Sequence, residues 1–164
     1  MQQMWTPWRM AYIRREKQPG CIFCEMLGAE DDRGQLILHR SGSTFLVLNK
    51  YPYNNGHLMA VPYRHVDTLE ELTAEEATDM MGLVSLGIRA LRRSANPEGF
   101  NIGVNIGKIA GAGVIDHVHS HVVPRWGGDT NFMPVLADVR LIPQDLNETY
   151  AELKAAVEEI LRIA

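Results

Sequence analysis

The first half of the chain alternates short apolar runs with turn-forming residues. Three runs, residues 36–39, 45–49 and 57–62, are rich in apolar side chains, and the residues between them include Gly, Ser, Asn and Pro. Short apolar runs bounded by such residues are typical of β-strands, and Pro62 suits the end of a strand or an edge position. Because the connections are short, the pattern predicts an antiparallel meander.

A helical period takes over after residue 73. Thr73 and Glu76 have the spacing of a capping box, and apolar side chains then recur three and four positions apart until the chain reaches Asn96. The positions of this apolar stripe are Ala77, Met80, Met81, Val84, Ile88 and Leu91. We interpret its Met pair as core packing. A second helix is predicted over residues 143–164, with Asn147 as its N-cap. Its apolar positions are Tyr150, Leu153, Val157, Ile160 and Leu161.

Residues 100–105 and 117–125 predict two further strands. The loop between them is rich in glycine: Gly103, Gly107, Gly111 and Gly113. The second strand carries His117, His119 and His121, half of the six histidines in the chain. Alternation along a strand places all three imidazoles on one face. Such a face could simply be exposed, but the glycine loop before it and the Pro-Arg pair after it favour a chemical role.

The N-terminal segment, residues 1–34, precedes these strands. Thr6 and Pro7 are typical of a helix start, and residues 25–30 indicate a short helix. Between them, Cys21-Ile22-Phe23-Cys24 brings together both cysteines of the chain. Two thiolates at this spacing supply half of a tetrahedral zinc site. The alternatives are reduced core cysteines and a redox motif, which would need a surrounding βαβ pattern that is lacking.

The composition limits the classes of function. The 164 residues suit a single domain, 1–164, because no linker or repeat divides them. The net charge of −4 and the pI near 5.8 argue against nucleic acid as a partner. No apolar run reaches membrane-spanning length, so no membrane contact is expected. The N-terminus lacks the basic and apolar pattern of a secretion signal, which predicts a cytoplasmic location.

The glycine loop and the histidines together indicate phosphate chemistry. Glycine lets backbone N–H groups approach an anion closely, and an imidazole can attack phosphorus to form a covalent intermediate. The rival interpretation is a metal site made by the three histidines. Because four strand residues span about 13 Å, His117 and His121 are too far apart to share one ion. We therefore favour a nucleophilic role.

The histidine segment resembles a known signature. His117-Val118-His119-Ser120-His121-Val122-Val123 is similar to the His-x-His-x-His-apolar-apolar motif of the histidine triad (HIT) family. The resemblance covers residues 21 to about 136. Its other parts are Cys-Ile-Phe-Cys, Asn49, Gly56-His57-Leu58, residues 61–65 and Asn105-Ile106-Gly107. Residues 116–132 resemble the branch that contains bacterial dinucleoside tetraphosphate phosphorylases.

The resemblance implies a role for each matching residue. His119 matches the nucleophile that takes the nucleotidyl group. His121 and His57 match groups that contact phosphate or position the nucleophile, and His117 supports the strand, contacts the nucleotide or ligates a metal. Asn49 matches a ribose contact. Further nucleotide contacts are implied for Asn105, Gly107 and Gly113.

One departure from the family pattern concerns the loop before the triad. Many relatives have Gln or Ser there, whereas this chain has Ala112-Gly113-Val114-Ile115, without a side-chain donor. Backbone N–H groups, or Lys108, would have to contact the phosphate instead.

The resemblance also implies the fold and the cofactor. The family fold is α+β, an antiparallel sheet of about five strands with two main helices, and the sheet usually continues across a homodimer. Several relatives bind structural zinc through the residues that match Cys21, Cys24, His65 and His117. No organic cofactor is expected.

The resulting hypothesis is an enzyme that acts on dinucleoside polyphosphates such as Ap4A. A nucleotidyl group would pass to His119 and then to phosphate or water. Hydrolysis of nucleoside phosphoramidates is the close alternative. A nucleotide-binding module with little turnover is a different class, favoured by the missing loop donor and opposed by the complete triad. A metal-dependent hydrolase is the third alternative.

Overall fold

The computed structural model describes residues 20–129 and 144–163. The predicted helix start at Thr6 and Pro7 and the last part of the family resemblance, residues 130–136, lie outside the described residues. Within them, no helix is long and apolar enough to span a membrane.

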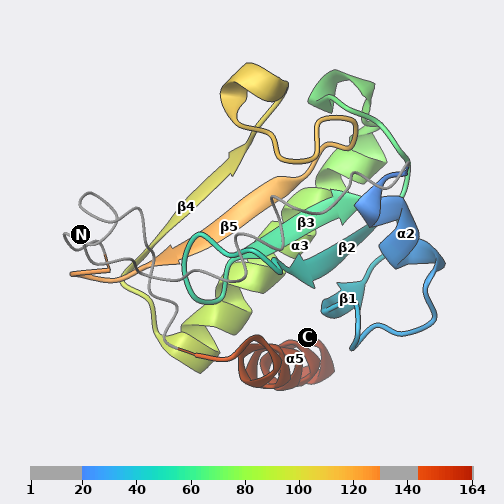
Figure 1. Cartoon of the computed structure of the whole chain (residues 1–164). Helices are drawn as coiled ribbons and strands as arrows, with labels where there is room; N and C mark the ends of the chain where they lie inside the picture. The colour runs from blue at the N-terminus through green and yellow to red at the C-terminus, as the bar shows by residue number, and fades with distance from the viewer. Residues whose placement is uncertain (1–19, 130–143, 164) are drawn as a thin grey trace.

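A five-stranded antiparallel sheet forms the centre of the fold (Figure 1). Its strands are β1 (Ile37–Arg40), β2 (Thr44–Leu48), β3 (Leu58–Pro62), β4 (Gly99–Val104) and β5 (Ser120–Arg125). The order β1-β2-β3-β5-β4 confirms the predicted meander of the first three strands. β5 lies between β3 and β4, so His121 pairs with Met59 on one side and Gly103 on the other.

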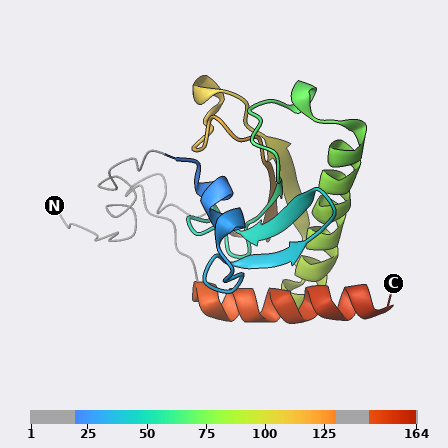
Figure 2. The same ribbon diagram turned by 90° about the vertical axis from the view of Figure 1, so that its right-hand side faces the viewer.

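One long helix runs along a face of this sheet, and the other crosses below it at the β1 edge (Figure 2). α3 (Ala74–Ala95) packs along one face, against β2, β3 and β5, and α5 (Leu146–Ile163) packs against α3 and β1. The predicted capping box is present, because the Thr73 side chain accepts from the Glu76 N–H and the Glu76 carboxylate accepts from the Thr73 N–H. Asn96 ends α3 in a left-handed conformation.

Most of the predicted apolar positions are in the core. Val84 and Leu91 of α3 are buried against the sheet, where each such side chain contributes about 1.5–3 kcal/mol. Met80 is also buried, but Met81 is 56% exposed, so the core interpretation of the Met pair is wrong for Met81. Leu161 is likewise exposed. The buried face of α3 instead includes Leu83, Leu86, Gly87 and Ala90.

Three element boundaries differ from the prediction by more than one residue. The short helix is α2 (Ile22–Gly28), not 25–30, because Cys21 is its N-cap and the Cys21 carbonyl accepts from the Glu25 N–H at 3.0 Å. Asn147 is not the cap of α5. The Asp145 carboxylate accepts from the Asn147 N–H at 2.8 Å, so Asp145 caps the helix. Two 3₁₀ turns, η1 (Leu69–Glu71) and η2 (Lys108–Ala110), complete the described elements.

The third boundary concerns the histidine segment. The strand begins at Ser120, so His117 and His119 precede it. The Val118 N–H donates to the Val66 carbonyl at 2.7 Å. That bond draws the segment toward the chain that follows β3 and away from the sheet ladder.

Candidate active site and metal centre

His57 and His121 form a buried pair. His57 directly precedes β3 and His121 is the second residue of β5, and the pairing of these strands brings the two rings together. The Nε2 atom of His57 lies 2.9 Å from the Nδ1 atom of His121. Both residues are buried.

Hydrogen-bond donors around His57 determine which of its ring nitrogens carries the proton. The backbone N–H of Tyr53 donates to His57 Nδ1 at 3.0 Å, and the Asn49 amide nitrogen lies 3.2 Å from the same atom. Because Nδ1 accepts, neutral His57 carries its proton on Nε2, and this N–H donates a hydrogen bond to His121. His121 therefore accepts through Nδ1 and, when neutral, carries its proton on Nε2.

His119 has the opposite tautomer. Its Nδ1 atom lies 2.9 Å from the carbonyl oxygen of His117, which can only accept. Neutral His119 is therefore protonated on Nδ1 and has its lone pair on Nε2. Its ring centroid lies 4.7 Å from that of His121 and 5.0 Å from that of Phe23.

Burial keeps these imidazoles neutral. It lowers the pKa of His119, and the bond to the His117 carbonyl offsets part of this effect. The pKa of His121 falls to about 4, first because of burial and then because of repulsion from His119. At neutral pH the site therefore presents a lone pair on His119 beside an N–H group on His121.

His117 belongs to a different cluster from the other two triad histidines. Its Nε2 atom donates to the Pro62 carbonyl at 2.9 Å, which leaves the lone pair on Nδ1. That Nδ1 atom lies 3.3 Å from the sulfur of Cys21 and 3.7 Å from the sulfur of Cys24. The three rings therefore do not form one group: the His117 ring lies beside the cysteines, whereas the His119 and His121 rings lie beside each other.

Cys21, Cys24, His65 and His117 have the geometry of a zinc site. The Cys24 sulfur lies 3.4 Å from His65 Nδ1, and one ligand atom from each residue lies within 4.8 Å of the others. In a tetrahedral zinc centre with S and N ligands, neighbouring ligand atoms are about 3.4–3.8 Å apart. The three short distances match this spacing, and His117 already offers an unprotonated nitrogen. The residues therefore fit the metal.

The remaining predicted residues lie around the histidines. Asn49 is half-buried beside His57, and its side-chain oxygen accepts from the Tyr51 N–H at 2.9 Å. Asn105, Gly107 and Gly113 lie in the connection between β4 and β5 that leads to His119. They take no part in the bond between His57 and His121 or in the bond between His119 and the His117 carbonyl.

Two aromatic residues of the site were missed by the sequence interpretation. The Tyr53 ring lies 4.6 Å from that of His57 and 5.6 Å from that of His121, and it is 44% exposed. Phe23 is buried against His117 and His119. The position of Phe23 between the two cysteines was a usable signal. Tyr53 gave none, because its backbone N–H makes the decisive contact.

Comparisons with known proteins point to one family. The family model described as HIT domain matches residues 33–128. A Mycobacterium tuberculosis protein named AP-4-A phosphorylase is 42% identical over 158 residues, which is 91% of this chain and 80% of that protein. An adenosine 5'-monophosphoramidase from Schizosaccharomyces pombe is 30% identical over 105 residues, 64% of this chain and 74% of that protein. A solved zinc-bound histidine triad family protein from Mycobacterium smegmatis is 28% identical with a TM-score of 0.72, covering 88% of this chain and 98% of its own.

Proposed function

Because the chain belongs to the HIT domain family, we propose that it is an enzyme that transfers a nucleotidyl group from an Ap4A-type dinucleoside polyphosphate through a covalent intermediate on His119. The observation that carries the proposal is the bond from His119 Nδ1 to the His117 carbonyl, which leaves the Nε2 lone pair available for attack. The name of the M. tuberculosis relative supports the substrate class.

In the first step, His119 Nε2 attacks the α-phosphorus of the substrate. A phosphorus–nitrogen bond forms, the bond from phosphorus to the bridging oxygen breaks, and the released nucleotide keeps both electrons of that bond. The Nε2–H of His121 donates a hydrogen bond to the phosphoryl or leaving oxygen, where negative charge develops. His57 holds His121 in the tautomer that this donation requires.

In the second step, the acceptor breaks the phosphorus–nitrogen bond. With Ap4A, the first step releases ATP and leaves AMP on His119. Phosphate as acceptor then gives ADP, and water gives AMP. The loop from Ala112 to Ile115 has no polar side chain, so its backbone N–H groups or Lys108 would hold the acceptor or the substrate phosphates.

Phosphoramidate hydrolysis is a second candidate. It uses the same nucleophile, and the similarity to the S. pombe phosphoramidase favours it. In that case the bond from phosphorus to the amine breaks in the first step, and His121 supplies a proton to the leaving nitrogen. A nucleotide-binding module with little turnover is the remaining alternative, favoured by the loop without a side-chain donor.

One experiment separates these candidates. The protein is incubated with Ap4A, with and without phosphate, and in parallel with adenosine 5'-phosphoramidate, and the nucleotide products are resolved. We expect ADP and ATP with phosphate if the acceptor is phosphate, and AMP and ATP in both conditions if it is water. Turnover of the phosphoramidate alone would favour the second candidate. Tight nucleotide binding without turnover of either substrate would refute the proposal that the protein is an enzyme.

We also propose that the Cys and His cluster holds structural zinc. When bound, the ion would fasten α2 to the segments around His65 and His117. The fit of the four ligand atoms and the similarity to a zinc-bound relative support this assignment.

A homodimer through β4 is the last part of the proposal. In the described part of the chain β4 pairs only with β5, so its other edge carries backbone groups without a strand partner. Ile102 is 47% exposed there. Pairing with β4 of a second copy would continue the sheet. A dimer mass by light scattering that falls to a monomer mass in Ile102→Asp would support this interface, and a monomeric wild type would refute it.

A further inference from the structure

The turn of residues 51–56 supplies one of the two donors at His57 Nδ1, and the Asn49 amide is the other. The Tyr53 N–H bonds to His57 Nδ1, and the Asn54 carbonyl accepts from the His57 N–H at 3.2 Å. The tautomers of His57 and His121 therefore depend on the orientation of the peptide between Pro52 and Tyr53, which carries this N–H. Asn54 directly follows Tyr53, so contacts that hold Asn54 in place also restrain Tyr53.

The Asn54 side chain is fixed by the end of β5. Its amide nitrogen donates to the Asp129 carboxylate at 2.8 Å and to the Pro124 carbonyl at 3.1 Å. Asn54 thus connects the turn to the strand that also carries His121.

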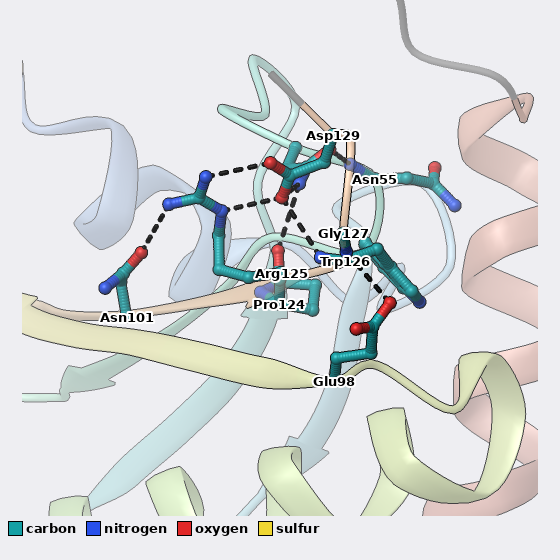
Figure 3. A network of polar contacts seen from close by, with 9 residues as sticks. Asn55, Glu98, Asn101, Pro124, Arg125, Trp126, Gly127 and Asp129 are labelled. Carbon is teal, nitrogen blue, oxygen red and sulfur yellow. Dashed lines mark hydrogen bonds and ion pairs between the residues drawn. The ribbon is translucent and has the colours of Figure 1, made fainter.

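Asp129 is itself held in place by several donors (Figure 3). Its carboxylate accepts from Arg125 through two nitrogens, at 2.6 and 2.8 Å, and from the Trp126 N–H at 3.1 Å. The Asp129 side chain is only 9% exposed. A charged acceptor with this many donors holds a single orientation and binds the Asn54 amide more strongly than a neutral acceptor would.

From these contacts we infer that Asn54 and Asp129 are a positioning pair for His57 and His121. The pair contacts neither the substrate nor the reacting atoms. It acts through the Tyr53 N–H, which together with the Asn49 amide keeps His57 Nδ1 as an acceptor. His121 then keeps its proton on Nε2, facing the phosphoryl group. The inference rests on the proposed function for its effect on turnover, but its effect on the histidine rings is independent of any substrate.

The turn has a second anchor, which makes the pair testable. The Asn55 amide donates to the Gln144 side chain at 3.1 Å, and the Thr149 hydroxyl lies 3.3 Å from the Asn55 side-chain oxygen. Loss of the bond between Asn54 and Asp129 therefore leaves the turn attached to the start of α5. We expect the variants to fold.

The test compares Asn54→Ala and Asn54→Asp with Asn101→Ala. Asn54→Asp keeps the size of the side chain but places a carboxylate against Asp129. Asn101 is the matched control, because it accepts from Arg125 in the same network at 2.8 Å but does not contact the turn. The readouts are kcat and KM with Ap4A, the melting temperature, the oligomeric mass, and the imidazole nitrogen spectrum of His57 and His121 at pH 7.5.

We expect kcat to fall about 10–100-fold in both Asn54 variants with KM within about threefold of the wild type. The nitrogen spectra of His57 and His121 should change from single tautomers to mixtures. Asn101→Ala should keep the wild-type kcat, mass and spectra.

Unchanged spectra and kcat in both Asn54 variants, with or without a lower melting temperature, would overturn the inference. So would failure of both variants to fold, because the pair would then be a requirement of folding. If the wild type turns over no nucleotide but the Asn54 variants still alter the two rings, the proposed function fails and the positioning role stands. If the wild type is active and the rings do not respond, only the inference fails.

Discussion

The Nδ1 atom of His119 lies 2.9 Å from the carbonyl oxygen of His117, whose own ring faces Cys21 and Cys24. His117 therefore contributes to two sites. Its side chain points to the proposed metal centre, and its backbone oxygen sets the tautomer of the proposed nucleophile. A rigid metal centre would hold that oxygen in place, since the ring and the carbonyl belong to the same residue.

His119 should be indispensable for turnover. In His119→Ala we expect the rate of Ap4A turnover to fall about a thousandfold or more, because no other group replaces a missing nucleophile. The protein mass after rapid quenching should show a nucleotidyl adduct in the wild type and none in the variant. His39→Ala is the control, since His39 lies on β1 and should keep full activity. Undiminished turnover in His119→Ala would refute the assignment.

Zinc should be bound in a ratio of about one ion per chain and should stabilise the fold. Elemental analysis of Cys24→Ser should show a strongly reduced zinc content, because the variant loses one thiolate of the four-ligand cluster. Its melting temperature should fall, as should that of chelator-treated wild type. A native sample that contains no metal and melts at the same temperature as the zinc-loaded protein would contradict the site.

The fold could be predicted largely because its signals are local. The strands and the capping box of Thr73 and Glu76 follow from side-chain type and spacing, which the sequence displays directly. The cap of α5 was assigned to Asn147 instead of Asp145 because both residues suit the role and lie two positions apart. A prediction from composition alone does not separate them.

The details of the site depend on contacts between distant parts of the chain. The Val118 N–H donates to the Val66 carbonyl, and the neighbouring His117 ring lies beside Cys21. The Tyr53 N–H orients His57, but every residue except proline has an N–H, so the sequence carries no mark of it. Residue types singled out the histidines and the cysteine pair, and the family resemblance supplied the four candidate metal ligands. Backbone geometry decided which nitrogen of each ring is available.

The stability of the protein should fall in mildly acidic solution, partly through His121. The pKa of His121 is about 4 in the folded chain, below its value of about 6.5 in an unfolded chain. A group whose pKa is depressed by folding stabilises the protein above the unfolded value, and this contribution is lost as the pH falls through the folded value. The loss should therefore occur between about pH 6.5 and pH 4.

His121→Gln isolates this contribution. Glutamine does not titrate, and its side-chain oxygen can still accept from His57 Nε2. Urea unfolding at pH 7.5, 6, 5 and 4 should show a smaller decline in unfolding free energy for the variant than for the wild type. The histidines that do not contact His121 are common to both proteins and cancel in the comparison. Parallel pH profiles would show that His121 is not the group responsible.

Gly56 should be intolerant of a side chain. Its φ of +74° is unfavourable for L-residues, and an added Cβ would lie 2.7 Å from a methyl carbon of Leu91 in the core. Gly56→Ala should therefore lower the unfolding free energy by about 2–4 kcal/mol. Turnover should fall as well, because Gly56 directly precedes His57 and the turn must shift to relieve the contact.

Gly82 provides the opposite case for comparison. It lies on the exposed side of α3, and an added Cβ would meet nothing within 4 Å. Gly82→Ala should raise the unfolding free energy by about 0.5–1 kcal/mol, since alanine favours the helix more than glycine does. Urea unfolding of the two variants at one pH measures both effects. Equal stabilities for Gly56→Ala and the wild type would mean that the turn before His57 is not held against Leu91. The position of the His57 ring would then be less constrained than its hydrogen bonds indicate.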